Sequence, residues 1–338
     1  MTTALAGDEL RHEIERAVST RTAGLGRIGK VGDEKNEFCL FLKPELTELS
    51  PENFVKVWAE ISEILDRFSV NVVAWTALPG SVLAETGAIQ AHYGVIDKIA
   101  RHGRTALSAE AESNLRTLLD DKWSTATSTT GAFQFLEKYP FFSTTALAIL
   151  FDNVGSVRLA GGSYAAPVNV RGENQIVFNG FHPDQLQRFT NDSASILVLW
   201  CASETSWVDL RKHMTGATNP ENSEPGSLRG TLLRRQDEFG IPEFNTGMNG
   251  IHVSAGPIEG IIELVRYFGA SDNATYADTK LGRAILEEGL GEATLRQFED
   301  NVTIDVDGTP TPIFDATEEL DTDQALEFLR TVLKPNER

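Results

Sequence analysis

A histidine and a glutamate spaced eleven residues apart offer the most distinctive chemistry in the sequence. His252 lies in the stretch NGIHVS, residues 249–254, and directly precedes a segment whose apolar residues recur at helical spacing. A neutral imidazole can attack phosphorus when an acceptor holds its other ring nitrogen and thereby fixes the tautomer. Glu263 falls off the apolar stripe of the expected helix, so its carboxylate is free to act as such an acceptor. The alternative is a structural histidine beside a solvent-facing glutamate.

Further positions in the same part of the chain extend this pattern. The segment GATNPENSEPGSLRG, residues 216–230, contains Thr218 and, eleven residues later, Arg229, and Asn249 stands three residues before the histidine. Together these residues resemble the signature of nucleoside diphosphate kinases. That signature has a G-x-T-N-P loop, an arginine eleven residues after its threonine, an N-x-x-H-x-S turn, and a glutamate eleven residues after that histidine. Each piece is weak alone, whereas the joint match is specific.

The resemblance implies transfer of the γ-phosphate of ATP, or of another nucleoside triphosphate, to a nucleoside diphosphate acceptor by ping-pong chemistry. In that scheme His252 attacks in line and becomes a phosphohistidine, Glu263 holds the imidazole, and Asn249 binds the sugar hydroxyl. Thr218 and Arg229 neutralise phosphate charge. Mg²⁺ would be bound through the nucleotide phosphates, without a metal ligand from the protein.

Four more residues receive a nucleotide-binding role from the resemblance. Lys43 ends a strand expected over residues 37–46 and resembles the lysine of the family's I-K-P-D strand, which contacts the phosphates; a solvated strand-end lysine is the alternative. Tyr93 lies in His-Tyr-Gly, similar to the family's E-H-Y, and corresponds to its active-site tyrosine; otherwise it is a packing residue. The family's phosphate-binding arginine corresponds to Lys212, with Arg211 one residue earlier, although lysine lacks the planar fork of arginine.

The chain also departs from the family pattern. Two places compete for its P-F-F-x-x-L segment, whose first phenylalanine stacks on the base: Pro140-Phe141-Phe142, and Phe178-Asn179-Gly180-Phe181. We prefer the second, which leaves Val177 in the stacking position, so that the aromatic clamp is missing or is supplied by another part of the chain. The loop between Arg229 and Asn249 is longer than is usual in the family.

These departures leave two other hypotheses open. One is a divergent phosphotransferase that uses the same histidine on a specialised nucleotide, as the insertions bordering the site suggest. The other is a nucleotide-binding protein that has lost turnover. A turnover assay against a panel of nucleoside diphosphates discriminates between them.

Composition restricts the partners and the compartment. Of 338 residues 41% are hydrophobic and 23% charged, as in ordinary globular proteins, and the net charge of −19 argues against nucleic-acid or anionic-membrane binding. No apolar run reaches the ~18 residues of a membrane span. The two cysteines, Cys39 and Cys201, lie in apolar runs typical of strands, which indicates buried thiols in a reducing cytoplasm. From the resemblance we expect a homo-oligomer, with a dimer as our hypothesis.

The remaining pattern predicts the elements that position these residues. Residues 7–18 are expected to form a helix, and the GLGRIGK stretch at 24–30 a flexible connector, because neither strand nor helix flanks its glycines. Ser50 and Pro51 open a helix with apolar residues through Phe68, and residues 69–78 form a β-branched strand. Near the C-terminus, an Asp-Gly hairpin turn at 307–308 is favoured over a calcium loop.

We therefore predict an α+β fold: a ferredoxin-like βαββαβ antiparallel sheet with helices, an inserted subdomain and a helical C-terminal extension. The expected domains are an N-terminal extension at 1–35, a nucleoside diphosphate kinase-like domain at 36–269, and a mostly helical extension at 270–338. The insertion is expected at about 95–176 within the kinase-like domain. The resemblance itself covers roughly 36–94 and 177–269.

Overall fold

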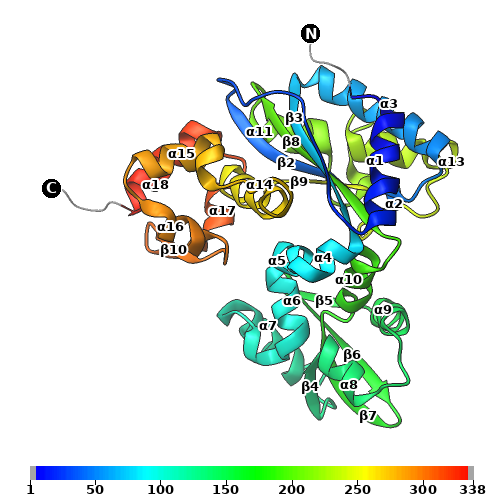
Figure 1. Cartoon of the computed structure of the whole chain (residues 1–338). Helices are drawn as coiled ribbons and strands as arrows, with labels where there is room; N and C mark the ends of the chain where they lie inside the picture. The colour runs from blue at the N-terminus through cyan, green and yellow to red at the C-terminus, as the bar shows by residue number, and fades with distance from the viewer. Residues whose placement is uncertain (1–4, 334–338) are drawn as a thin grey trace. The chain divides into compact units, whose positions relative to one another are not determined.

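The computed structural model describes residues 5–333 of the chain (Figure 1). The contacts divide the chain into two compact units. The first unit comprises Met1–Thr86 and Asp192–Arg338, and the second comprises Gly87–Asn191. The domain boundaries expected from the sequence remain predictions.

The first unit is built on a five-stranded sheet in which all neighbouring strands are antiparallel. Its strands are β1 (Gly24–Arg27), β2 (Asn36–Leu42), β3 (Val70–Pro79), β8 (Ser195–Ser203) and β9 (Ile251–Val253), in the order β1-β3-β8-β2-β9. β2 lies between β8 and β9, with Phe41 opposite both Val198 and His252. The strand order of β3, β8, β2 and β9 is compatible with a βαββαβ arrangement, and the expected α+β class is confirmed.

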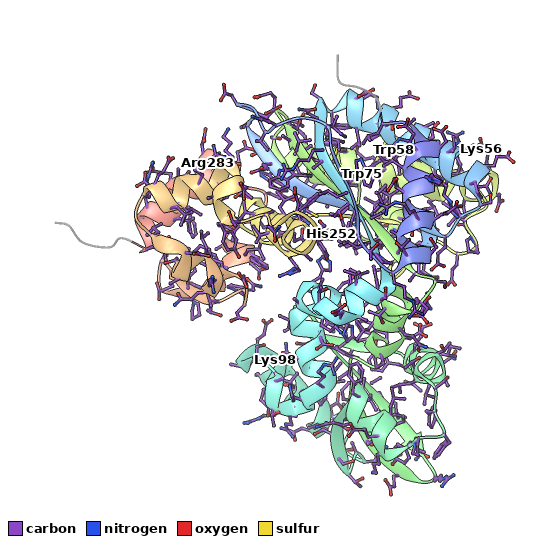
Figure 2. All side chains as sticks on the ribbon, viewed as in Figure 1. Lys56, Trp58, Trp75, Lys98, His252 and Arg283 are labelled. Atoms are coloured by element: carbon purple, nitrogen blue, oxygen red, sulfur yellow. The ribbon has the colours of Figure 1, made fainter. Side chains whose placement is uncertain are left out.

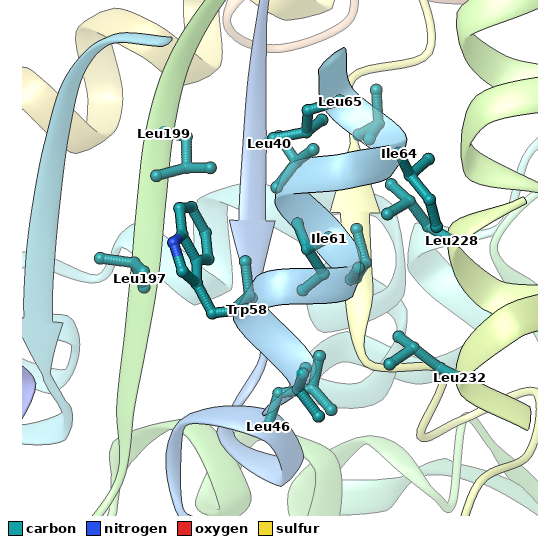
Figure 3. Close-up of a cluster of buried hydrophobic side chains, with 14 of the residues drawn as sticks. Leu40, Leu46, Trp58, Ile61, Ile64, Leu65, Leu197, Leu199, Leu228 and Leu232 are labelled. Carbon is teal, nitrogen blue, oxygen red and sulfur yellow. The ribbon is translucent and has the colours of Figure 1, made fainter. Parts of the chain in front are cut away.

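One face of this sheet packs against α1 (Gly7–Thr20) and α3 (Pro51–Arg67). Alternate residues of β2 point into this core, because successive side chains of a strand face opposite sides. Figure 3 shows part of the cluster, which includes Leu40, Trp58, Ile61, Leu197 and Leu199. α3 begins as predicted, with Pro51 in its first turn and the Ser50 side chain accepting a hydrogen bond from the backbone N–H of Asn53.

The opposite face of the sheet packs against α14 (Pro257–Asp272). Gly260 allows the helix to approach β2 closely, since a Cβ there would lie 3.2 Å from the carbonyl oxygen of Glu37. The ring of Tyr267 meets that of Phe41 with centroids 5.6 Å apart. These contacts place one side of α14 directly over the centre of the sheet.

The C-terminal extension packs on the other side of α14. It consists of η4 (Tyr276–Asp278), α15 (Lys280–Glu287), α16 (Gly291–Phe298), β10 (Thr303–Val306), β11 (Thr309–Pro312), α17 (Ile313–Thr317) and α18 (Thr322–Leu333). Its apolar side chains form one cluster with Ile258, Ile261 and Ile262 of α14. The expected hairpin turn is confirmed, since Asp307 and Gly308 connect β10 to β11 with positive φ angles.

The prediction of a flexible connector over residues 24–30 is wrong, because the first four of these residues form β1. This strand pairs with β3 at the edge of the sheet, with Gly26 opposite Trp75. A Cβ at Gly26 would lie 2.4 Å from the Trp75 ring, so only glycine lets the strand pass over the indole. The partner strand lies far along the chain, which is why the local sequence did not reveal the pairing.

Shorter elements connect the strands of the first unit. They are α2 (Pro44–Thr47), α4 (Gly80–Thr86), α11 (Trp207–Asp209), η2 (Leu210–Thr215), η3 (Pro220–Asn222), α12 (Leu228–Arg234) and α13 (Gln236–Phe239). Between β8 and the Gly216 loop, α11 is continued by the π-helical turn η2. This turn ends at Thr215 and leads directly into Gly216 and the loop that follows it.

The second unit has its own sheet and its own core. Its helices are α5 (Ala88–His92), α6 (Gly94–His102), η1 (Gly103–Ala106), α7 (Ala109–Asp120), α8 (Ala132–Lys138), α9 (Thr144–Asn153) and α10 (His182–Thr190). The strands are β4 (Ser128–Gly131), β5 (Val157–Ala160), β6 (Ser163–Val170) and β7 (Glu173–Phe178), in the order β4-β7-β6-β5, with β4 parallel to β7. Among residues 5–333, no helix has the length and apolar character that crossing a membrane requires.

Candidate active site

His252 and Glu263 form a hydrogen-bonded pair in the structure. The His252 side chain, labelled in Figure 2, belongs to β9 and is 17% exposed. Its Nε2 lies 2.8 Å from Oε1 and 3.0 Å from Oε2 of Glu263. An ionised carboxylate only accepts hydrogen bonds, so with an ionised Glu263 the ring proton would lie on Nε2. The Phe41 ring stacks on the imidazole at a centroid distance of 4.7 Å and so fixes its plane.

The alternative of a solvent-facing Glu263 is wrong, since the residue is fully buried. Gly260, Glu263 and Tyr267 share the side of α14 that packs on the sheet, while Ile258 and Ile262 share the side covered by the C-terminal extension. The sequence pattern revealed only the second side. The helix is therefore buried on two sides, and the carboxylate lies between the helix and the sheet.

Ser254 holds the buried carboxylate from a second direction. Its Oγ donates to Oε2 of Glu263 at 2.6 Å and accepts from the backbone N–H of Cys39 at 3.1 Å. A buried charge needs such partners, because an unpaired one carries a large desolvation cost. Sequence reasoning missed this role of Ser254, although the residue lies two positions after the histidine.

Lys43 and Asn249 form a second buried contact in the first unit. The Nζ of Lys43 donates to Oδ1 of Asn249 at 2.7 Å, and Nδ2 of Asn249 donates to the carbonyl oxygen of Thr218 at 3.0 Å. Burial lowers the pKa of Lys43 to about 8; Glu45 counteracts this change and Arg229 adds to it. Lys43 is therefore a buried ammonium group close to losing its proton at neutral pH.

The turn that carries Asn249 is fixed by the end of β2. Gly250 has a φ of +72° and makes two hydrogen bonds, each of 2.8 Å. Its carbonyl oxygen accepts from the backbone N–H of Lys43, and its own N–H donates to Oε1 of Glu45. A left-handed φ favours glycine at this position. Glu45 was not predicted from the sequence, and it both orients the turn and supports the charge of Lys43.

Arg229 connects the Gly216 loop to the histidine strand. Its guanidinium donates to the carbonyl oxygens of Gly216 at 3.0 Å and of Ile251 at 2.8 Å. The structure thus gathers Lys43, Thr218, Arg229, Asn249, His252 and Glu263 from segments that are widely separated in the sequence.

Arg211 and Lys212 of η2 lie at the turn that follows the histidine strand. The Arg211 guanidinium is 3.4 Å from the carbonyl oxygen of Ala255. Both side chains also form ion pairs with the C-terminal extension: Arg211 with Glu318, and Lys212 with Glu319 at 3.1 Å. The sequence indicated neither glutamate.

Two other residues named from the resemblance belong to the second unit. The Tyr93 ring packs edge-on against His92 with centroids 4.6 Å apart, and its proposed role remains a prediction. Val177 lies in β7 with no exposed surface, inside the core of its unit. A side chain without exposed surface cannot stack on a base, so an aromatic clamp would have to come from elsewhere.

The charges gathered around His252 suit a phosphate-bearing ligand. Lys43 and Arg229 supply positive charge, and the carboxylates of Glu45 and Glu263 are already engaged by Gly250 and by His252 with Ser254. A phosphate-bearing ligand held by these cations would bring Mg²⁺ through its own oxygens.

Comparison with known proteins finds local similarity to one kind of enzyme. The chain is 36% identical over 76 residues to the nucleoside diphosphate kinases of Chloroflexus aurantiacus and Chloroflexus aggregans. The matched stretch is 22% of this chain and 44% of each of those kinases, so the chain spans less than half the length of these curated relatives. No protein-family model matches the chain. A distant relationship to nucleoside diphosphate kinases is what these comparisons support.

Proposed function

We propose that this chain is a nucleoside diphosphate kinase-like phosphotransferase that moves the γ-phosphate of a nucleoside triphosphate to a nucleoside diphosphate through phosphorylated His252. The observation that carries the proposal is the bond between His252 Nε2 and the buried Glu263 carboxylate. The local identity to the Chloroflexus kinases supports the same class of reaction. The strand order β3-β8-β2-β9 supports a ferredoxin-like core.

In the proposed reaction the Nδ1 lone pair of His252 attacks the γ-phosphorus in line. A P–N bond forms, the bond from phosphorus to the bridging oxygen breaks, and the nucleoside diphosphate leaves with the electron pair. A β-phosphate oxygen of the acceptor diphosphate then attacks the phosphohistidine, and the electrons of the P–N bond return to Nδ1. Glu263 stabilises the positive charge that develops on the ring in each half-reaction.

The other residues of the site would position the substrate and neutralise its charge, which is the main requirement of phosphoryl transfer. Lys43 and Arg229 would bind phosphate oxygens, and Asn249 would bind a sugar hydroxyl. Arg211, Lys212 and Thr218 would complete the phosphate contacts, with Tyr93 in the role that the resemblance gives it. When bound, Mg²⁺ would supply further charge neutralisation through the phosphate oxygens. A homo-oligomer and a cytoplasmic location remain part of the proposal.

A specialised nucleotide substrate is the second candidate. A separate compact unit, Gly87–Asn191, interrupts the chain between β3 and β8, and the similarity to the Chloroflexus kinases covers only 22% of the chain. This candidate predicts phosphorylation of His252 by ATP but slow transfer to ordinary nucleoside diphosphates. A binding protein without turnover predicts no phosphorylation at all.

The test is incubation with γ-labelled ATP and Mg²⁺, followed by acid and base treatment of the labelled protein. We expect a phosphate that is acid-labile and base-stable, and its loss in His252→Ala. His213→Ala is the matched control, because His213 also contacts a glutamate, Glu224, but is exposed. Labelling that survives His252→Ala, or that His213→Ala removes, would contradict the assignment.

A further inference from the structure

An acidic loop of the C-terminal extension packs against the candidate phosphate site. This loop, residues 318–321, connects α17 to α18. The N–H of Glu319 donates to the carbonyl oxygen of Ala255 at 3.1 Å. A Cβ at Gly256 would lie 2.5 Å from the carbonyl oxygen of Thr317, which shows how closely the two backbones approach. The acidic loop is therefore seated on the turn that directly follows the histidine strand.

The first two residues of the acidic loop contact two cations of the site. Glu318 pairs with Arg211, and Glu319 lies 3.1 Å from Lys212 and 3.8 Å from Arg211. All four side chains are partly exposed, from 28% for Arg211 to 56% for Lys212. Ion pairs at such positions are weak and are screened by salt, so a ligand phosphate can exchange with the carboxylates.

From these contacts we propose that Glu318 and Glu319 are specificity-determining residues that oppose the binding of phosphate-rich ligands at Arg211 and Lys212. The inference rests on the proposed function, since it takes these two cations as phosphate-binding. Each carboxylate cancels one positive charge that a phosphate would otherwise meet. The effect therefore grows with the number of ligand charges, and nucleotides with fewer phosphates are disfavoured least.

Calorimetric titrations of the 338-residue chain at low ionic strength test this proposal. One series uses AMP, ADP and ATP in EDTA; the other uses phosphate, pyrophosphate and tripolyphosphate, which need no nucleoside site. In the double variant Glu318→Gln, Glu319→Gln we expect affinity for ATP and tripolyphosphate to rise about two- to twentyfold. The gain should shrink through ADP to AMP and should disappear at high salt.

The matched control removes the same charge from the same extension, away from Arg211 and Lys212. Glu292→Gln, Glu327→Gln serves this purpose, because each of these exposed glutamates pairs with an arginine of its own helix. We expect this control to leave all affinities unchanged. An equal gain in the control would mean that only net charge matters, and would overturn the proposal.

A double-mutant cycle separates competition from a purely structural role. Arg211→Gln, Lys212→Gln should weaken tripolyphosphate binding more when the Glu318→Gln, Glu319→Gln changes are also present than in the wild-type chain, because the cations are then available. Equal losses in both backgrounds, or no gain for any ligand in the glutamate double variant, would overturn the proposal. Phosphorylation of His252 by γ-labelled ATP, measured in the same proteins, tests the proposed function separately. The polyphosphate series measures binding only and does not depend on phosphoryl transfer.

Discussion

The chemistry of single residues at this site depends on what burial does to their charges. Glu263 is an ionisable group with no exposed surface, held by His252 and Ser254, and Lys43 is an ammonium group whose pKa has fallen to about 8. Both residues have polar partners at hydrogen-bond distance. These groups therefore have fixed partners before any ligand binds, which would lower the reorganisation that the proposed reaction requires.

The substitution Glu263→Gln should keep the fold and slow the chemistry. Its amide oxygen can accept from His252, and its NH₂ can donate to Ser254 Oγ if that hydroxyl turns to the Cys39 carbonyl oxygen, 3.2 Å away. The neutral amide cannot offset the positive charge on the ring. Losing a charge-assisted bond costs about 1.5–3 kcal/mol, so phosphorylation of His252 should slow roughly ten- to a hundredfold. Rapid-quench kinetics measure this step.

An unchanged phosphorylation rate in Glu263→Gln would make the carboxylate a structural group only. Ser254→Ala is the companion variant, since it keeps the bond between Glu263 and His252 and removes the second support. We expect a smaller loss of rate in that variant. Circular dichroism and melting temperature check that both proteins remain folded.

Lys43 should make ligand affinity depend on pH. Its pKa is lowered, chiefly by burial, to about 8, so it is protonated below that pH and neutral above it. A bound phosphate favours the protonated form, so the Kd for ADP should rise about tenfold between pH 7 and pH 9. Lys43→Met should bind more weakly at pH 7 and show little of this rise. Isothermal titration calorimetry at several pH values measures this change. An equal rise of the Kd in both proteins would show that Lys43 is not the group responsible.

At the scale of elements, close backbone approaches position the strands and helices of the first unit. Gly260 brings α14 onto β2, Gly256 admits the Thr317 carbonyl, and Gly26 lets β1 pass over Trp75. At Gly26 and Gly256 the absent Cβ allows a contact that a larger residue would block, and at Gly260 a Cβ would be tight against the Glu37 carbonyl oxygen. The histidine strand β9 is short, so its position depends on β2 and on the turn that Gly250 makes.

Gly26→Ala should loosen β1 from the sheet. The new Cβ would meet the Trp75 ring at 2.4 Å, and a rigid, buried indole cannot move aside freely. Overpacking of this kind typically costs about 1–3 kcal/mol, so the melting temperature should fall. Gly29→Ala is the control, because nothing lies within 4 Å of its added Cβ. Equal melting temperatures for the two variants would show that β1 can move away from Trp75 without loss of stability.

At the scale of the first unit, the C-terminal extension completes the core. Ile258, Ile261 and Ile262 of α14 cluster with its apolar residues. Buried polar contacts join it to β2: Asn36 donates to Asp321 at 2.7 Å, and Glu37 accepts from the Lys280 N–H at 2.6 Å. The extension is thus part of the support of the helix that carries Glu263.

A chain ending at residue 269 should therefore lose stability and solubility. Three buried isoleucines would be exposed, and each would lose about 1.5–3 kcal/mol of burial free energy. Asn36 and Glu37 would also lose hydrogen-bond partners. We expect aggregation by size-exclusion chromatography. Replacing Ile258 and Ile262 by glutamine in the shortened chain should partly restore solubility. A shortened chain that is monodisperse and melts like the 338-residue chain would disprove the supporting role of the extension.

The sequence by itself determined the features that depend on neighbouring residues. The spacing of Asn249, His252 and Glu263, the Ser50 cap and the Asp307-Gly308 turn each involve residues that are close together in the sequence, so local pattern is sufficient. The α+β class followed from the same patterns.

Only the tertiary structure decided which groups are buried and which charges meet. Lys43 contacts Asn249 across 206 positions, and Arg211 contacts Glu318 across 107. Glu263 became buried because α14 packs on the sheet with one side and on the C-terminal extension with the other. Desolvation and ion pairing depend on what surrounds a group in space, and for these residues the surroundings come from distant parts of the chain.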